Sequence, residues 1–197
     1  MLEFKTEKLT HRVTRIYAFA TELMYLVEGD ERALLIDTGS GVGSLKHCIK
    51  QLTDKPLTVL VTHGHVDHAM GALEFDDVYM NHKDDDIYTL HNSLQFRKDG
   101  IIKLSNGLVP ADEDIIPSAP LSHFKNLQGG DVFDLGGITI EVYDCPGHTR
   151  GSVVMLIKEE RSLLLGDAWN SSHSSGLRLE QSASLPGSPP PPIGLFR

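Results

Sequence analysis

The apolar positions of this chain fall into short runs that are separated by glycine, aspartate and other polar residues. Runs of this length, rich in branched and aromatic side chains, predict β-strands, because strands in globular proteins usually span about 5–6 residues. The dipeptides Gly29-Asp30 and Glu159-Glu160 would turn the chain between neighbouring strands. The expected strands cover residues 12–19, 22–27, 33–36, 57–61, 78–80, 131–135, 138–143, 152–157 and 162–165.

Other segments have the spacing of amphipathic helices. We expect a helix at 42–52 after the glycine-rich turn at 39–43, a short helix at 67–75 and a longer one at 83–96. Residues 97–128 have mixed polarity and three prolines, and such a segment over a site would set the choice of substrate. Strands that alternate with helices predict an α/β domain.

Candidate metal ligands gather directly after the expected strand at 57–61. The sequence THGHVDHAMG at 62–71 places three histidines and one aspartate within six positions. His63 and His65 are two apart, so on an extended chain their imidazoles point to the same side. Asp67 and His68 follow where the chain can turn and direct a second pair of ligands to a neighbouring point. Since sites in α/β proteins commonly lie at the carboxyl ends of strands, we predict a metal site here.

Two further strand ends offer ligands. His148 lies in the turn CPGHTRG at 145–151, and Asp167 follows Gly166 after an apolar strand. A histidine in a turn or an aspartate after a glycine is most often structural when it stands alone. Three ligand clusters at strand ends in one short chain instead favour a shared metal site.

Together, THGHVDH, PGHT and the later Gly-Asp resemble the metallo-β-lactamase-fold hydrolase superfamily, and the glyoxalase II-like thioesterases are the most similar branch. The resemblance covers residues 12–167, and in ALLIDTG at 33–39 Asp37 matches the aspartate that braces the family's metal loop. It implies a four-layer αβ/βα sandwich with two metal ions in a cleft between the half-domains.

The resemblance also implies a role for each candidate residue. Asp37 would hold the ligand loop by hydrogen bonds without contacting metal. One metal would be bound by His63, His65 and His148, the other by Asp67 and His68, and Asp167 would bridge the two ions.

Imidazole and carboxylate ligands suit Zn²⁺, and iron or manganese also fit this ligand set. We expect two zinc ions. Two cations that share a water would lower its pKa from about 15.7 to about 7, which gives a hydroxide nucleophile at neutral pH. The metals would also polarise the scissile carbonyl, and Asp67 could orient the hydroxide and accept its proton.

The C-terminal part departs from the family pattern. Family members continue past the bridging aspartate to a final histidine, whereas here only His173 follows Asp167, and we expect it to be a surface residue. The composition changes near Trp169, and residues 169–197 are rich in serine and proline. This predicts a disordered tail after a domain at 1–168 and an incomplete second half of the sandwich. Either a truncation or reading-frame artefact has replaced the end of that half, or the chain is a natural short variant.

Composition narrows the choice of partners. A net charge of −9 without a cluster of lysine or arginine argues against a nucleic-acid partner. The N-terminus has no signal-like apolar region and no stretch approaches the length of about 20 residues that spans a bilayer, so we expect a cytoplasmic protein with no membrane partner. Its two cysteines, Cys48 and Cys145, are expected to be buried free thiols. The oligomeric state stays open.

Several polar side chains near the middle of the chain are expected to be solvated rather than functional. They are the acidic run at 84–86, Tyr88, His91, Arg97, Lys98, Lys103 and His123.

The sequence therefore predicts a metal-dependent hydrolase that uses a metal-activated hydroxide on a small ester-like or thioester-like substrate. Two alternatives stay open. One is a catalytically impaired metal-binding remnant, which would bind one metal at the three-histidine site. The other is a phosphodiesterase or nuclease, although the net charge of −9 weakens it.

Overall fold

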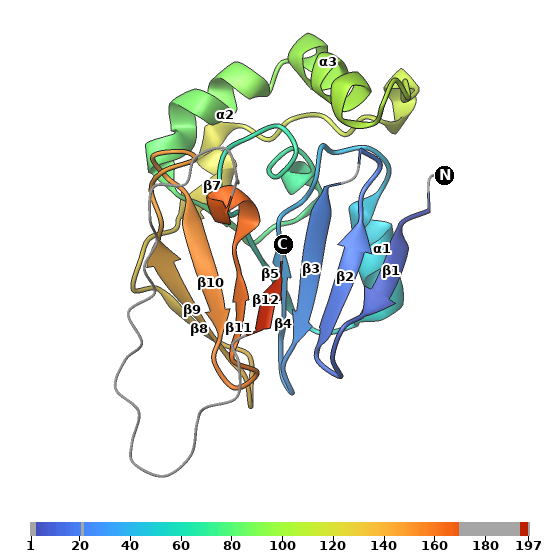
Figure 1. Ribbon diagram of the computed structural model, residues 1–197. Helices are drawn as coiled ribbons and strands as arrows, with labels where there is room; N and C mark the ends of the chain where they lie inside the picture. Colours follow the sequence, from blue (N-terminus) through green and yellow to red (C-terminus); the bar gives the residue numbers. More distant parts are fainter. Residues whose placement is uncertain (1–2, 21, 170–193, 197) are drawn as a thin grey trace.

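The computed structural model describes residues 3–20, 22–169 and 194–196. Two β-sheets face each other, and helices α2 (Asp85–His91) and α3 (Leu94–Leu104) lie across one end of them (Figure 1). Helix α1 (Leu45–Leu52) packs on the outer face of the first sheet. Short 3₁₀ helices are η1 (Ala72–Glu74), η2 (His82–Asp84), η3 (Asp112–Asp114), η4 (Leu121–His123) and η5 (Gly166–Trp169).

The first sheet has seven strands in the order of the chain, antiparallel from β1 to β4 and parallel from β4 to β7. The carboxyl ends of β4 and β5 therefore meet at one edge of the sheet. Its strands are β1 (Lys5–Lys8), β2 (Val13–Tyr17), β3 (Leu23–Glu28), β4 (Ala33–Ile36), β5 (Leu57–Leu60), β6 (Val78–Met80) and β7 (Phe124–Asn126).

In the described part of the chain, the second sheet has five strands in the order β12-β11-β10-β9-β8. Neighbours are antiparallel except β11 and β12, which run parallel. Its strands are β8 (Val132–Asp134), β9 (Thr139–Asp144), β10 (Val153–Ile157), β11 (Ser162–Leu164) and β12 (Gly194–Phe196).

Alternation along the strands builds two cores. On β3, Met24 and Leu26 pack towards α1, whereas Tyr25 and Val27 pack towards the second sheet. The three layers α1, first sheet and second sheet confirm the expected α/β sandwich. On the outer face of the second sheet a smaller apolar cluster forms around Val154, and none of the described α-helices contributes to it. The described residues therefore supply three of the four expected layers.

Two expected helices differ from the structure. Residues 67–75 form turns and η1, because the amides of Thr38 and Met70 donate to His68 and Gly39 and tie this segment to the loop after β4. The expected helix at 83–96 is two helices, since the Ser93 hydroxyl accepts from the Phe96 amide and starts α3 there.

Most of the expected disordered tail, including His173, lies outside the described residues. Its last described part, Gly194–Phe196, is a strand beside β11 rather than an irregular segment, because backbone pairing with β11 does not depend on the tail's composition. None of the described helices has the length and apolarity that a bilayer crossing requires. Both cysteines are buried and free, as expected.

Candidate metal centre

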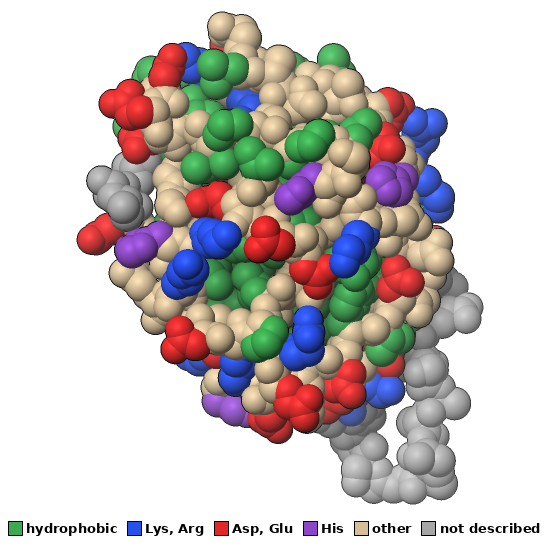
Figure 2. All heavy atoms as spheres, turned by 180° about the vertical axis from the view of Figure 1, so that it is seen from behind, with side chains coloured by type: hydrophobic (Ala, Val, Ile, Leu, Met, Phe, Trp, Pro, Cys, Tyr) green, Lys and Arg blue, Asp and Glu red, His purple; other side chains and the backbone are tan. Residues whose placement is uncertain are grey.

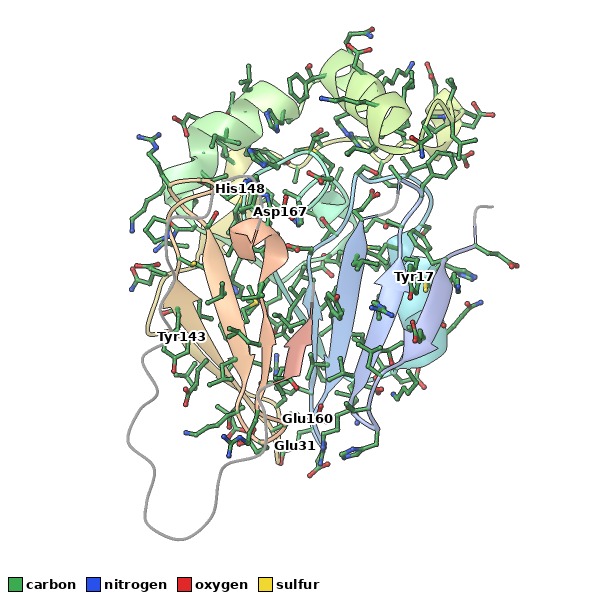
Figure 3. The ribbon with its side chains drawn as sticks, viewed as in Figure 1. Tyr17, Glu31, Tyr143, His148, Glu160 and Asp167 are labelled. Carbon is green, nitrogen blue, oxygen red and sulfur yellow. The ribbon has the colours of Figure 1, made fainter. Side chains whose placement is uncertain are left out.

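The predicted ligands and the bracing residue Asp37 come from four strand ends that meet beneath α2 and α3. His148 and Asp167 lie at this end of the second sheet, whereas Glu31 and Glu160 mark the opposite end (Figure 3). Asp37 follows β4, the segment from His63 to His68 follows β5, His148 lies between β9 and β10, and Asp167 begins η5 after β11. The structure brings all seven predicted residues into one region.

Gly166 lets the end of β11 approach the first ligand loop. Its φ is +50°, and a Cβ atom at this position would lie 2.8 Å from the Thr62 hydroxyl oxygen. Glycine alone combines this backbone conformation with such close packing. Asp167 is thereby carried next to His68.

The first group of ligand atoms consists of three imidazole nitrogens. His65 Nδ1 lies 3.1 Å from His63 Nε2 and 2.9 Å from His148 Nε2. A neutral imidazole nitrogen either donates or accepts a hydrogen bond, so His65 Nδ1 cannot form good hydrogen bonds to both of these nitrogens at once. Three lone pairs that converge in this way fit a cation that prefers imidazole ligands.

The protonation of these rings also suits metal binding. Burial, followed by the charges of neighbouring histidines, lowers the pKa of His63 well below its ordinary value. Burial and the charges of His148 and His91 lower the pKa of His65 to about 4. Both rings are therefore neutral at pH 7, the form in which imidazole binds a metal.

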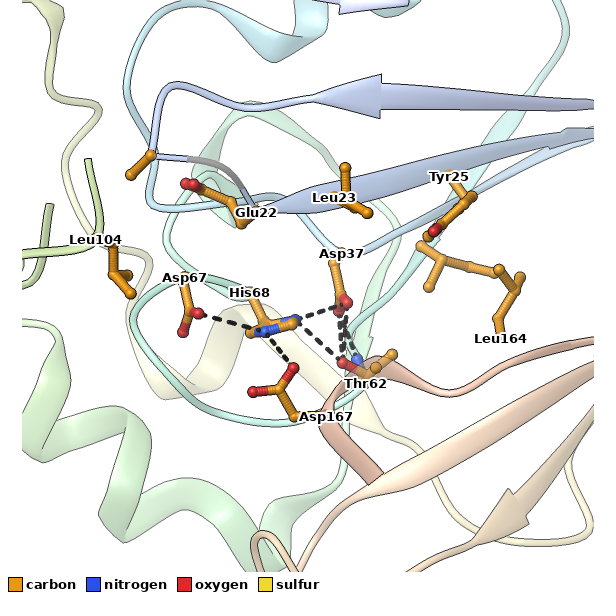
Figure 4. Close-up of a pocket in the computed structure, with 13 residues that line it drawn as sticks. Glu22, Leu23, Tyr25, Asp37, Thr62, Asp67, His68, Leu104, Leu164 and Asp167 are labelled. Carbon is orange, nitrogen blue, oxygen red and sulfur yellow. Dashed lines mark hydrogen bonds and ion pairs between the residues drawn. The ribbon is translucent and has the colours of Figure 1, made fainter. Parts of the chain in front are cut away.

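A second group lies beside the first (Figure 4). His68 Nε2 is 3.6 Å from an Asp67 oxygen and 3.7 Å from an Asp167 oxygen. The other Asp167 oxygen is 3.4 Å from His148 Nε2. Asp167 thus stands between the two groups with one oxygen towards each, and His63, His68 and Asp167 can hold one ion together.

Asp37 holds this second group from behind. It is 3% exposed, accepts from the Thr62 amide at 2.7 Å and pairs with His68 Nδ1 at 2.8 Å. Burial lowers the pKa of His68, but the charge and hydrogen bond of Asp37 outweigh burial and raise this pKa to about 10. The stabilisation by this pair is complete below the unfolded pKa of about 6.5 and is lost as the pH rises through 10.

We expect Asp37→Ala to lower the free energy of unfolding of the metal-free protein by about 3–5 kcal/mol, because it removes the hydrogen-bonded counter-charge of the buried His68 and the acceptor of the buried Thr62 amide. Asp37→Asn is the matched control, since it keeps an acceptor for Thr62 and tolerates the φ of +62° at this position. Urea unfolding measures both. A loss below about 1 kcal/mol for the alanine variant would contradict the bracing role.

The stability of the metal-free protein should depend on pH through the titration of His65. Its pKa is about 4 in the folded chain and about 6.5 when unfolded, so the unfolded chain binds more protons between these values. The contribution of His65 to stability is therefore lost as the pH falls from 6.5 to 4. We expect urea unfolding of the metal-free proteins to show that the free energy of unfolding falls more between pH 6.5 and 4.5 for the wild type than for His65→Gln. Equal losses would show that His65 is not buried as a neutral ring.

Some side chains expected to be solvated are buried beside the centre. Tyr88, Arg97 and Asp84 are at most 1% exposed, and His91 stacks on His65 with ring centroids 4.9 Å apart. Arg97 donates to backbone carbonyls of the loop after β4, which explains its burial. The spacing of Asp84, Tyr88 and His91 at i, i+4 and i+7 was the available signal, because it places them on one helix face.

A family model described as "Metallo-beta-lactamase superfamily" matches residues 20–172. The human acyl-coenzyme A thioesterase MBLAC2 is 28% identical over 164 residues, which is 73% of this chain and 57% of that protein. The probable metallo-hydrolase YqgX of Bacillus subtilis is 27% identical, over 73% of this chain and 64% of the relative. This chain thus spans somewhat more than half the length of these curated relatives.

Among solved structures, a metallo-beta-lactamase from Pontibacter korlensis is similar with a TM-score of 0.56 and 18% identity, over 82% of this chain and 70% of that one. An archaeal metallo-beta-lactamase superfamily protein from Sulfolobus tokodaii has a TM-score of 0.51 at 18% identity, over 79% and 62% of the two chains. At such identities the likeness concerns the fold.

Proposed function

We propose that this chain, which belongs to the metallo-beta-lactamase superfamily, is a hydrolase and more narrowly a dinuclear metal-dependent thioesterase. The family model confirms the resemblance of its motifs to the superfamily. Its fold implies binding of a divalent metal. The observation that carries the proposal is the pair of ligand groups that share Asp167 between them.

In the proposed centre His63, His65 and His148 would hold one ion. Asp67 and His68 would hold the other, and Asp167 would contribute a ligand oxygen to each. The convergence of the three imidazole nitrogens supports the first site, and the proximity of Asp67 and Asp167 to His68 Nε2 supports the second. Zinc suits these nitrogen and oxygen ligands best.

When bound, the ions would supply a water of lowered pKa and polarise the carbonyl of the substrate. The remaining roles fall to side chains of this chain. Asp67, whose side chain is 23% exposed, faces the cavity and would accept the proton of the attacking water. Asp37 forms a hydrogen bond with Nδ1 of His68, which orients the ring so that Nε2 faces Asp67 and Asp167.

The cavity beside the centre favours an acyl substrate. It has a volume of about 300 Å³. Beside the polar side chains of Glu22, Asp37, Thr62 and the ligands, part of its wall is apolar (Figure 4). None of the described residues that line it is lysine or arginine. Apolar residues next to the reacting carbonyl suit an acyl chain, and the relative MBLAC2 is an acyl-coenzyme A thioesterase. The apolar lining consists of Ala20, Leu23, Tyr25, Ile36, Leu104 and Leu164.

The same features weigh against a phosphodiesterase or nuclease. A phosphodiester needs cationic side chains along its backbone, and the cavity lacks them among its described residues. On the face shown in Figure 2, lysine and arginine are interspersed with aspartate and glutamate rather than gathered in one basic patch.

The direct test is release of a free thiol from acyl-coenzyme A by the zinc-loaded protein, compared with cleavage of a chromogenic phosphodiester. We expect thioester hydrolysis and an inert phosphodiester. Phosphodiester cleavage with inert thioesters would replace the proposal by a phosphodiesterase. Turnover of neither substrate class would favour the catalytically impaired metal-binding remnant.

A further inference from the structure

Asp84 is a wholly buried carboxylate at an unusual place. It precedes α2 in the N-cap position, where an aspartate ordinarily accepts from the helix's own first amides. Here its side chain makes no capping hydrogen bond, and its exposed fraction is 0%. The carboxylate is therefore directed away from its own helix.

Both oxygens of Asp84 join the two loops that carry the three histidines. Oδ2 accepts from the amide of Gly64 at 2.9 Å, and Gly64 lies between His63 and His65. The same oxygen accepts from the Thr149 hydroxyl at 2.7 Å, and Oδ1 accepts from the Gly151 amide at 2.7 Å. One side chain thus holds the loop after β5 against the loop after β9.

The hydroxyl partner of Asp84 is itself fixed. Thr149 has a single hydroxyl proton, and an ionised Asp84 can only accept it. Ser152 Oγ, 2.7 Å from Thr149 Oγ1, must then donate to that oxygen while it accepts from the Thr149 amide at 3.0 Å. These hydrogen bonds have fixed donors and acceptors, and they tie the loop beside His148 to Asp84.

Both loops carry glycine where Asp84 meets them. A Cβ atom on Gly64 would lie 3.0 Å from the Asp84 Cβ, and one on Gly151 would lie 2.7 Å from its Cγ. Larger residues at either position would push the carboxylate away from its donors. The two glycines and Asp84 therefore fit one another closely.

The charge of Asp84 has no cation beside it among the described residues, since none of the ion pairs there includes it. A buried carboxylate is costly unless donors or a positive charge compensate it. Three donors compensate it in part, and a divalent cation held by the same two loops would add the missing positive charge.

We propose that Asp84 is a positioning residue, which clamps the His63–His65 loop to the His148 loop so that the three imidazoles are in place before metal binds. This inference rests on the proposed three-histidine metal site. Asp84 contacts neither metal nor substrate, and its effect passes through Gly64, Thr149 and Gly151.

The test is the zinc affinity of Asp84→Asn, measured by competition with a chromophoric chelator. The measurement is made under conditions in which urea unfolding shows that the metal-free variant is fully folded. Loss of a residue that holds metal ligands in place without contacting the metal typically weakens metal binding by about 10–100-fold, and we expect zinc affinity to fall within that range. Asp85→Asn is the matched control, since the side chain of the neighbouring Asp85 is partly exposed and pairs with His82; we expect wild-type affinity there.

A purely structural role would lower the unfolding midpoint and leave the zinc affinity of the folded protein unchanged, and that result would overturn the proposal. If Asp84→Asn does not fold, Thr149→Val removes one donor and leaves the carboxylate in place. We expect Thr149→Val to bind zinc more weakly and Thr149→Ser to restore binding. Unchanged affinity in Thr149→Val would then overturn the clamp.

Wild-type protein serves as the reference for the metal site itself. Failure of the wild type to bind zinc would contradict the proposed metal centre. Zinc binding by the wild type with equal affinity in the Asp84 and Thr149 variants would contradict only the role of Asp84.

Discussion

Removal of bound metal with a chelator is expected to abolish thioester hydrolysis by this protein. In the proposed centre the activated water and the stabilisation of the oxyanion both depend on the two ligand groups around Asp167. Loss of one oxyanion-stabilising donor alone typically slows acyl transfer by about 10²–10³-fold, so we expect a fall of at least about 1,000-fold. The rate of thiol release before and after dialysis against chelator measures it.

Readdition of zinc is the control for this experiment, and it should restore the rate. Far-ultraviolet circular dichroism of the metal-free protein should keep its native form, because the two apolar cores do not involve the ligand groups. Activity that survives complete metal removal would contradict metal-dependent hydrolysis.

The second large effect is expected from Asp67→Asn. The Asp67 carboxylate lies 3.6 Å from His68 Nε2 and lines the cavity, where it would bind the second ion and accept a proton. Loss of a general base typically costs about 10²–10⁴-fold in rate, and we expect kcat/KM for the thioester to fall within this range. Steady-state kinetics at saturating zinc measure the fall.

Asp99→Asn is a suitable control for Asp67→Asn, because Asp99 is an exposed aspartate on α3 that contacts Gln95. Its kcat/KM should equal that of the wild type. The Asp67 variant should retain the metal of the three-histidine site, which does not use this carboxylate. A fall of less than about threefold in kcat/KM would contradict both roles of Asp67.

Much of the fold was visible in the sequence because its signals are local. The buried strands β3, β4 and β5 consist of apolar runs, and the first ligand loop follows β5 directly. Strand β1 escaped prediction, since all four of its residues are exposed and only its pairing with β2 makes it a strand. Strand β7 also escaped prediction, since two of its three residues are exposed.

The parts that could not be predicted depend on contacts between distant segments. The turn at His68 is fixed by the amide of Thr38, which lies 30 residues earlier in the chain. Asp84 is expected from the sequence to be part of a solvated acidic run, but the loops after β5 and β9 supply the donors that make its burial possible. Helical spacing predicts that Asp84 and Tyr88 share one helix face, but it does not predict which segments pack against that face.

The number of metal ions per purified chain, determined by elemental mass spectrometry, tests the dinuclear centre most directly. The position of Asp167 between His68 and His148 predicts close to two ions per chain, with zinc as the expected element. One ion or none would contradict the dinuclear centre, since Asp67, His68 and Asp167 would then fail to hold the second ion and only the metal-binding remnant would be left.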